Sequence, residues 1–437
     1  MDINVTGTEP NLQDLLACRP QLNMHAVDGL CLEDVPLNAI ADQYGTPTYV
    51  YGAGSIRARF ASLRDAFQAE NLPIHIHYAV KANDHLAILA LLGEQGAGAD
   101  VVSIGEFLRA TKAGIQSEHI VYSGVGKAVF ELETALAAGV GQINVESAEE
   151  VEMISAIATR LGVEARIALR MNPDVDAGTH AKITTGLADN KFGIAASDIP
   201  ALYAYAASLP GIKTLGIAMH IGSQILSTEP YRLAYSKGAD MVRALRAAGQ
   251  SVEIMDLGGG LGIGYQDEPA LSPRAFAAMV RQVCQGLNVR LMMEPGRYLV
   301  GPAGVLLASV ILNKQAGKRF IVLDAAMNDL IRPAMYDAWH GILPLAASAL
   351  HASALPADVV GPICESSDIF AKDRKLPNLS PGARVAFLDA GAYGSVMSNT
   401  YNARPRPAII LVDNGRFNLI TPRQTHEDLW QSEILPT

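Results

Sequence analysis

The sequence contains few cysteines, few aromatic residues and no run of basic residues. The 437-residue chain has four cysteines, 6% aromatic residues and a formal net charge of −10 at pH 7. The cysteines form neither a CxxC pair nor a compact framework, which argues against structural zinc and disulfide stapling and favours a reducing cytoplasm. An acidic chain would repel a phosphate backbone, so nucleic acid and anionic membranes are poor candidate partners.

Long hydrophobic runs are also missing. No stretch has the roughly 18 uninterrupted apolar residues of a membrane span, and the N-terminus lacks a basic start followed by an apolar run. The chain is nevertheless 49% hydrophobic and has 39 glycines, a composition that suits a large buried core with tight turns. We therefore expect a soluble metabolic enzyme that is neither exported nor inserted into a membrane.

Between about residues 75 and 294, β-rich runs alternate with longer Ala/Leu-rich stretches, as in parallel βαβ units. Eight runs predict an α/β fold with a closed (β/α)8 barrel, with residues 54–69 as a helix before the first run. An open, doubly wound sheet is the alternative, but no dinucleotide-binding fingerprint supports it. The runs are His75–Lys81, Ala99–Ser103, His119–Tyr122, Gln142–Val145, Ala165–Arg170, Leu215–Ile221, Val252–Leu257 and Val289–Glu294.

The chain is longer than the usual limit of about 250 to 300 residues for a single core, and its pattern changes after Glu294. Later strand-like runs are separated by turn-rich segments, and Pro47–Tyr51 and the segment around Leu30 resemble strands outside the eight. We predict an N-terminal extension (1–24), strands that join a β domain (25–53), a barrel (54–300) and a C-terminal, mainly β domain (301–437).

A lysine stands at the carboxyl end of the first run, in Tyr78-Ala79-Val80-Lys81-Ala82-Asn83. Barrel enzymes place catalytic groups at this end of their strands, and a lysine there can form a Schiff base with a carbonyl compound. The alternative is a lysine that simply extends its charged end into solvent.

The loops after the seventh and eighth runs have the chemistry of a phosphate site. Gly258, Gly259 and Gly260 let backbone N–H groups approach an anion closely, and barrels often bind phosphate at these two loops. Glu294-Pro295-Gly296-Arg297 combines a carboxylate that could bind a protonated pyridine nitrogen with an arginine that could bind phosphate or a carboxylate. A flexible turn and an ordinary Glu/Arg surface pair are the alternatives.

A histidine ends the sixth run, in Met219-His220-Ile221-Gly222-Ser223-Gln224. His220 could lie flat against a planar cofactor, and Ser223 could donate a hydrogen bond to phosphate. A hydrogen-bonded core histidine is the alternative.

Together these motifs resemble the pyridoxal phosphate (PLP)-dependent decarboxylases of the alanine-racemase-like fold, PLP fold type III, and within them the diaminopimelate decarboxylases. The resemblance extends from about residue 25 to 430 and includes Asn190-Lys191-Phe192-Gly193. It implies PLP as cofactor and no catalytic metal, with Lys81 and His220 as catalytic residues. The implied cofactor site consists of Lys81, Asp100, His220, Ser223, Gly258, Gly259, Gly260, Glu294, Pro295, Gly296, Arg297 and Tyr393.

Later motifs carry the resemblance to diaminopimelate decarboxylases in particular. They are residues 332–338, 361–365, 392–394 and 402–407. The resemblance implies that Arg297, Arg332 and Tyr336 bind the carboxylate at the non-reacting end of the substrate, that Glu365 binds its ammonium group, and that Tyr393 contacts substrate or phosphate.

The resemblance also implies that Cys364 returns a proton to the carbanion left by decarboxylation. A buried free thiol without a role is the alternative. From the residues alone, Arg332 could equally pair with Asp329 or Asp337. An ornithine or lysine substrate, however, would leave buried guanidinium groups without a partner, which is costly.

The predicted reaction is therefore the decarboxylation of meso-2,6-diaminopimelate to L-lysine and carbon dioxide, the last step of lysine biosynthesis. The resemblance implies a homodimer whose active site lies between subunits. The alternatives are a decarboxylase acting on ornithine, arginine, a D-amino acid or carboxynorspermidine, an amino acid racemase, and a non-catalytic PLP carrier. Two positions depart from the family pattern: Ser367 replaces the glycine of Cys-Glu-Ser-Gly-Asp, and Trp339 stands where tyrosine is common.

Overall fold

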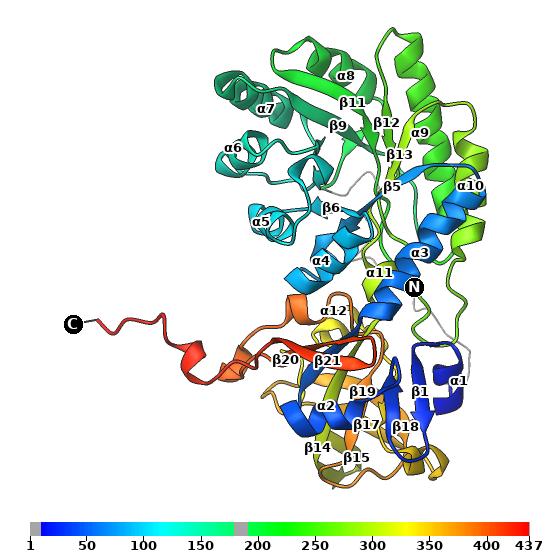
Figure 1. The fold of residues 1–437 in the computed structure, drawn as a ribbon, viewed down its shortest axis with the longest axis vertical. Coiled ribbons are helices and arrows are strands. Elements are labelled where there is room, and N and C mark those ends of the chain that lie inside the picture. The colour runs from blue at the N-terminus through cyan, green and yellow to red at the C-terminus, as the bar shows by residue number, and fades with distance from the viewer. Residues whose placement is uncertain (1–9, 179–190, 437) are drawn as a thin grey trace. The chain divides into compact units, whose positions relative to one another are not determined.

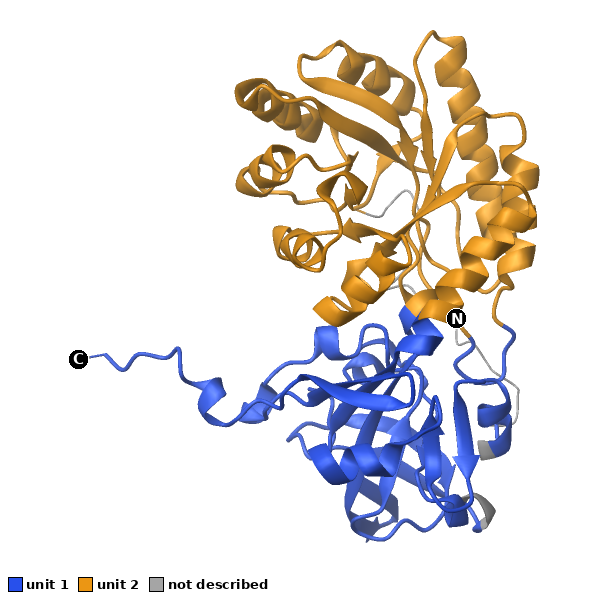
Figure 2. Ribbon diagram, in the orientation of Figure 1, with its two compact units in different colours: residues 1–56, 264–269, 300–437 blue, residues 57–263, 270–299 orange. Residues whose placement is uncertain are grey.

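The computed structural model describes residues 10–178 and 191–436 and divides into two compact units (Figures 1 and 2). Unit 1 comprises residues 1–56, 264–269 and 300–437, and unit 2 comprises residues 57–263 and 270–299. Asn190, which belongs to one of the motifs above, lies outside the described residues.

Unit 2 contains a closed barrel of eight parallel strands. Their order is β9–β11–β12–β13–β5–β6–β7–β8, and β8 pairs with β9 to complete the circle. The predicted barrel is confirmed and the open sheet was wrong. The strands are β5 (Ile74–Ala79), β6 (Gly98–Val101), β7 (Ile120–Tyr122), β8 (Gln142–Val145), β9 (Ala165–Asn172), β11 (Ile212–Ala218), β12 (Ile254–Asp256) and β13 (Arg290–Met293), with the short β10 (Ile194–Ala195) beside β9.

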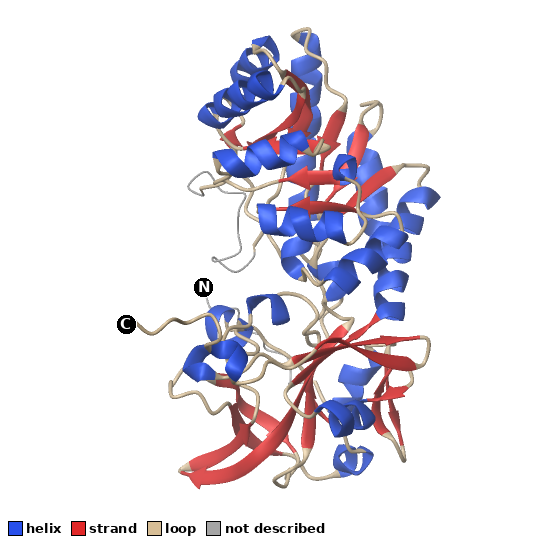
Figure 3. Ribbon diagram, turned by 60° about the vertical axis from the view of Figure 1, so that its left-hand side comes forward, coloured by secondary structure: helices blue, strands red, loops and turns tan. Residues whose placement is uncertain are grey.

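Helices surround these strands (Figure 3). Serine residues fix where two of them begin: the hydroxyl oxygens of Ser103 and Ser147 each accept a hydrogen bond, 3.2 Å long, from a backbone N–H in the first turn of the helix that follows. Each helix therefore starts just beyond the end of a strand. The helices are α3 (Ala53–Ala69), α4 (Leu86–Glu94), α5 (Ile104–Lys112), α6 (Val129–Ala137), α7 (Ala148–Leu161), α8 (Ile199–Ser208), α9 (Glu229–Ala247) and α10 (Pro273–Cys284).

Unit 1 is mainly β and includes strands from both ends of the chain, as predicted. β4 (Thr48–Gly52) pairs antiparallel with β14 (Gly304–Ala316) and parallel with β20 (Ala408–Asp413). The sheet order is β18–β17–β15–β14–β4–β20–β21, with β19 beside β14 and β16 beside β19. The remaining strands of this sheet are β15 (Lys318–Leu323), β16 (Ile342–Pro344), β17 (Leu355–Val360), β18 (Ile369–Leu376), β19 (Arg384–Phe387) and β21 (Arg416–Thr421).

A separate three-stranded sheet precedes β4 in the chain. It consists of β1 (Leu22–His25), β2 (Gly29–Leu32) and β3 (Val35–Pro36). Two helices flank it in sequence, α1 (Leu12–Ala17) and α2 (Leu37–Tyr44). Apolar residues of these elements and of β4, β14, β16, β19 and β20 form one buried cluster. Two further short helices are α11 (Arg297–Val300), after the last barrel strand, and α12 (Arg332–Tyr336), after β15.

A buried ion pair links the N-terminal segment to the rest of unit 1. Arg19 Nη2 lies 2.5 Å from Asp389 Oδ2, and both side chains are almost completely buried. The guanidinium also donates to the backbone carbonyl oxygens of Leu15 and Tyr265. Arg19 thus joins three segments of unit 1 that are far apart in the sequence.

Among the described residues, no helix combines the length and apolar character needed to cross a membrane.

Candidate active site

The predicted cofactor residues of unit 2 follow the carboxyl ends of barrel strands. Lys81 lies in a single 3-10 turn (Val80–Ala82) directly after β5, and Asp100 belongs to the neighbouring β6. His220 follows β11, the glycine run follows β12 and Glu294 follows β13. Because parallel strands place these ends at one mouth of a barrel, residues that are more than 200 positions apart in the sequence come together.

Lys81 is held by a buried carboxylate. Its Nζ lies 3.3 Å from Asp100 Oδ2, and 36% of the Lys81 side chain is exposed while Asp100 is fully buried. The other oxygen, Asp100 Oδ1, has no hydrogen-bond partner among the described residues. Since an unpaired buried acceptor is costly, this oxygen is suited to accept a hydrogen bond from a bound ligand.

Glu294 lies in a buried polar cluster within the barrel. The side-chain amide of Asn144 is 3.1 Å from Glu294 Oε1 and 3.4 Å from Asp256 Oδ2. Burial raises the pKa of Glu294 well above its ordinary value, and the negative charges of Asp100 and Asp256 raise it further. A cation placed beside Glu294 would relieve this unfavourable arrangement, so the site fits a protonated ring nitrogen.

His220 is kept neutral. Its Nδ1 accepts a hydrogen bond of 3.1 Å from the backbone N–H of Gly259, which assigns the proton of the neutral ring to Nε2. Burial, together with the nearby charges of Lys81 and Arg170, holds its pKa well below the ordinary histidine value. A neutral imidazole can contact a planar cofactor without adding positive charge to it.

The glycine run is packed too closely for side chains. A Cβ atom on Gly259 would lie 2.2 Å from the backbone oxygen of Glu294, and one on Gly260 would lie 2.5 Å from that of Gly222. Gly260 has φ +98°, in the region that other residues avoid, and its N–H has no acceptor among the described residues. The loop therefore offers a free backbone donor where an anion can approach.

The same candidate phosphate-binding site also contains a charged hydrogen-bond donor. Arg297 Nη2 donates to Ser223 Oγ at 3.1 Å, which places a guanidinium beside the hydroxyl of the His220 motif. Between Glu294 and Arg297 the chain packs on the first strand: Ala79 N donates to Pro295 O at 3.2 Å, and a Cβ on Gly296 would lie 3.0 Å from Ala82 Cβ.

The motif at residues 191–193 is fixed to the end of β9. The Gly193 N–H donates to Glu146 Oε2 at 2.8 Å, and Arg170 Nη1 pairs with Glu146 Oε1 at 2.6 Å. The Arg170 guanidinium also lies over the Phe192 ring, 4.9 Å from its centroid. These contacts hold Phe192 and Gly193 beside the end of β9. The sequence identified their motif only through its resemblance to the family.

Apart from Arg297, which belongs to unit 2, the predicted substrate residues lie in unit 1. Arg332 begins α12 and is buried, with its guanidinium 4.7 Å from the centroid of the Tyr265 ring and Nη1 2.6 Å from His340 Nε2. Tyr336, at the other end of α12, is half-buried. Tyr393 is also half-buried and has φ +56°, in the left-handed region.

Cys364 and Glu365 lie in an exposed loop between β17 and β18. The backbone N–H of Cys364 donates to Asn402 Oδ1 at 3.2 Å, so a second loop, residues 399–404, contacts the first. The thiol is free and exposed. The alternative of a buried core thiol is therefore wrong for this residue.

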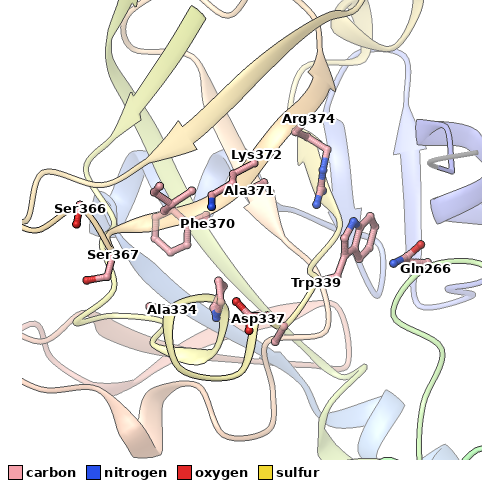
Figure 4. A pocket seen from close by; sticks show the side chains of 13 residues that line it. Gln266, Ala334, Asp337, Trp339, Ser366, Ser367, Phe370, Ala371, Lys372 and Arg374 are labelled. Atoms are coloured by element: carbon pink, nitrogen blue, oxygen red, sulfur yellow. The ribbon is translucent and has the colours of Figure 1, made fainter. Parts of the chain in front are cut away.

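A pocket of about 490 Å³ lies beside this loop within unit 1 (Figure 4). Its walls include residues of α12 and β18, and the guanidinium of Arg374 lies 4.3 Å from the centre of the Trp339 ring at its edge. None of the predicted site residues lines it. The lining residues are Gln266, Pro333, Ala334, Asp337, Ala338, Trp339, Ser366, Ser367, Ile369, Phe370, Ala371, Lys372 and Arg374.

Sequence reasoning missed two residues of the barrel cluster, Asp256 and Asn144. Asp256 immediately precedes the glycine run, and its Oδ1 accepts a hydrogen bond from the Gly258 N–H at 3.0 Å. A carboxylate at the end of an apolar strand was a usable signal. Asn144 offered none, because Asp256 and Glu294, the carboxyl groups that it contacts in this cluster, are 112 and 150 residues away in the chain.

Comparisons with known proteins point to one family. The family model of the pyridoxal-dependent decarboxylases, which describes their pyridoxal-binding domain, matches residues 53–301. A diaminopimelate decarboxylase of Zymomonas mobilis is 47% identical over 411 residues, covering 92% of this chain and 96% of that protein.

Two solved structures match most of the chain. The diaminopimelate decarboxylase of Helicobacter pylori complexed with L-lysine is 40% identical, with a TM-score of 0.87 over 91% of this chain and 98% of the other. The enzyme of M. jannaschii in complex with L-lysine is 33% identical, with a TM-score of 0.90 over 96% of this chain and 98% of the other.

Proposed function

This chain belongs to the pyridoxal-dependent decarboxylases, and within them to the diaminopimelate decarboxylases, and we propose that it converts meso-2,6-diaminopimelate to L-lysine and carbon dioxide with PLP as cofactor. The observation that carries this proposal is the likeness to the Zymomonas mobilis enzyme over 92% of the chain, because it extends well beyond residues 53–301, which the pyridoxal-binding family model matches. The reaction is that of a carboxy-lyase in lysine biosynthesis.

The barrel residues would bind different parts of the cofactor, its ring and its phosphate. PLP, when bound, supplies an electron-accepting ring for the electrons left behind by carbon dioxide. Glu294 would hold a proton on the ring nitrogen, since a buried carboxylate is stabilised by a positive charge beside it. Ser223, Arg297 and the N–H of Gly260 would bind the phosphate, and Lys81 would supply the amine that attaches the cofactor.

The unit 1 residues would recognise the end of the substrate that does not react. That end carries a carboxylate and an ammonium group, which require a cation and an anion as partners. Arg332 and Tyr336, with Arg297, would bind the carboxylate, and Glu365 would bind the ammonium group. The exposed Cys364 thiol would deliver a proton to the α carbon after carbon dioxide leaves.

We also propose a cytoplasmic homodimer in which Cys364 and Glu365 of one subunit complete the site of the other. The family resemblance and the exposure of both residues support this arrangement. Mixing Lys81→Ala and Cys364→Ala proteins, each inactive alone, should restore part of the activity, because a mixed dimer contains one complete site. Light scattering should report two chains per particle, and failure of the mixture to regain activity would contradict a shared site.

The main proposal is tested by carbon dioxide release from PLP-loaded protein offered meso-diaminopimelate, L-ornithine, L-arginine or D-lysine, with products identified. We expect release from meso-diaminopimelate alone, with L-lysine as the product. Lys81→Ala is the control and should lose both the activity and the covalently attached cofactor. Release from a different amino acid would overturn the substrate assignment, and no release from any would overturn the proposed reaction.

A further inference from the structure

Each carboxylate oxygen of Glu365 accepts a hydrogen bond from a different hydroxyl group. Tyr401 Oη lies 2.5 Å from Oε1, and Ser367 Oγ lies 2.8 Å from Oε2. Two donors on opposite oxygens fix the plane of the carboxylate. Since a carboxylate has about four acceptor positions, both oxygens can still bind a further donor.

The backbone around this pair of hydrogen bonds is itself fixed. The buried carboxylate of Asp368 accepts hydrogen bonds of 2.7 Å from the backbone N–H groups of Ile363 and Met327. The loop that carries Glu365 is thereby tied at both ends. Together with the hydrogen bond from Cys364 N to Asn402 Oδ1, this brings Tyr401 to the same carboxylate.

One of the two hydroxyl donors is a departure from the family pattern. Ser367 occupies the place of the glycine in Cys-Glu-Ser-Gly-Asp, and a glycine there has no hydroxyl to donate. The backbone φ of Ser367 is not positive, so the loop does not need glycine at this position. The side chain therefore adds a contact without straining the backbone.

We propose that Ser367 and Tyr401 are positioning residues that determine specificity, because they hold the Glu365 carboxylate ready for the ammonium group at the distal end of the substrate. This inference rests on the proposed function, which assigns that ammonium group to Glu365. The hydrogen bonds from Tyr401 and Ser367 also lower the pKa of Glu365 from its ordinary value, so the carboxylate stays charged and attractive to a cation.

Two ligands separate this role from general support of the loop. L-lysine has a carboxylate and an ammonium group at its α carbon, as the distal end of the proposed substrate does. 6-Aminohexanoate is the same molecule without that ammonium group. The inhibition constants of both should be measured on PLP-loaded wild type, Ser367→Ala, Tyr401→Phe and the double variant, with decarboxylation of meso-diaminopimelate as the assay.

We expect each single variant to weaken L-lysine binding about 3- to 10-fold and the double variant more, in line with the loss of hydrogen bonds to a charged group. Inhibition by 6-aminohexanoate should not change, because that ligand lacks the α-ammonium group that Glu365 would bind. Ser367→Thr keeps the hydroxyl and should restore wild-type binding, whereas Ser367→Gly, the family residue, should behave like Ser367→Ala.

An equal loss for both ligands would overturn the proposal and assign the two hydroxyl groups a purely structural role. Unchanged L-lysine binding in the double variant would also overturn it, while leaving the proposed function intact. If the wild type neither decarboxylates meso-diaminopimelate nor binds L-lysine, the proposed function fails first and this inference fails with it.

Discussion

The side-chain amide of Asn144 bridges the carboxyl groups of Asp256 and Glu294, which stand at the ends of neighbouring barrel strands; it lies 3.4 Å from Asp256 Oδ2 and 3.1 Å from Glu294 Oε1. Burial raises the pKa of both carboxyl groups, because it disfavours their charged forms. In the cofactor-free protein this buried pair therefore favours a proton next to the place where a ring nitrogen needs one. Burying these two carboxyl groups lowers the stability of the folded protein but suits the binding of a protonated ring. Stability and activity can therefore both be tested.

Glu294→Gln should raise the thermal stability of the cofactor-free protein at pH 7 to 8 by roughly 1 to 3 °C while lowering the decarboxylation rate at least about 100-fold. Burial raises the pKa of both carboxyl groups, so the stability they provide is present at low pH and is lost as pH rises. The gain should thus shrink toward pH 5. Thermal melts of both proteins across this range test it, and a Glu294→Gln protein less stable than wild type at pH 8 would contradict the expectation.

His77, buried in β5, should make the protein less stable in mild acid. Burial, together with His75 and His119, lowers its pKa to about 3, whereas an unfolded histidine titrates near about 6.5. Between these values only the unfolded chain takes up the proton, so stability should fall as pH drops from 7 to 5. His77→Leu should flatten this dependence in thermal melts of the cofactor-free protein, while exposed His426→Gln should not. Equal slopes for His77→Leu and wild type would refute the assignment.

Gly259→Ala should weaken PLP binding at least about 10-fold and lower stability. The added Cβ would lie 2.2 Å from the backbone oxygen of Glu294, so the loop or the end of β13 must move. Gly126→Ala is the matched control, because a Cβ there meets nothing within 4 Å and its φ is not positive. Cofactor affinity can be followed by absorbance. Wild-type affinity in Gly259→Ala would show that the glycine run does not pack closely against the cofactor.

Arg19→Ala should destabilise unit 1 by about 3 to 5 kcal/mol, because it removes the guanidinium that pairs with the buried Asp389 carboxylate. Removing both charges together, in Arg19→Met with Asp389→Leu, should cost less. Arg243→Ala, which breaks the exposed pair with Asp240, should have almost no effect. Urea unfolding of the three variants measures these differences. An unchanged free energy of unfolding in Arg19→Ala would mean that the N-terminal segment contributes little to the stability of unit 1.

The strands of the barrel could be predicted from the sequence because apolar runs and helical stretches alternate along the chain. Their ends were less certain: the seventh run was predicted as Val252–Leu257, whereas β12 covers only Ile254–Asp256. β10, two residues long, has no sequence pattern of its own. Lys81 and Glu294 could be found because their motifs are contiguous.

Interactions that depend on distant residues could not be predicted. The importance of Asp256 depends on Asn144, which is 112 residues away in the chain. In the same way, the sequence showed Glu365 within a motif but could not show that the hydroxyl of Tyr401, 36 residues away in the chain, donates to its carboxylate. Such contacts are set by packing between segments, which the local sequence does not encode.

The position of β4 between β14 and β20 has a consequence for how the protein is made. A ribosome produces β4 before the barrel, but both of its partner strands only after residue 303. Until then the buried side chains of Tyr49, Val50 and Tyr51 have no strand to pair with. The barrel strands are all synthesised before either partner strand, so this apolar segment stays unpaired until the last third of the chain is made, and during that time its exposed apolar surface favours aggregation.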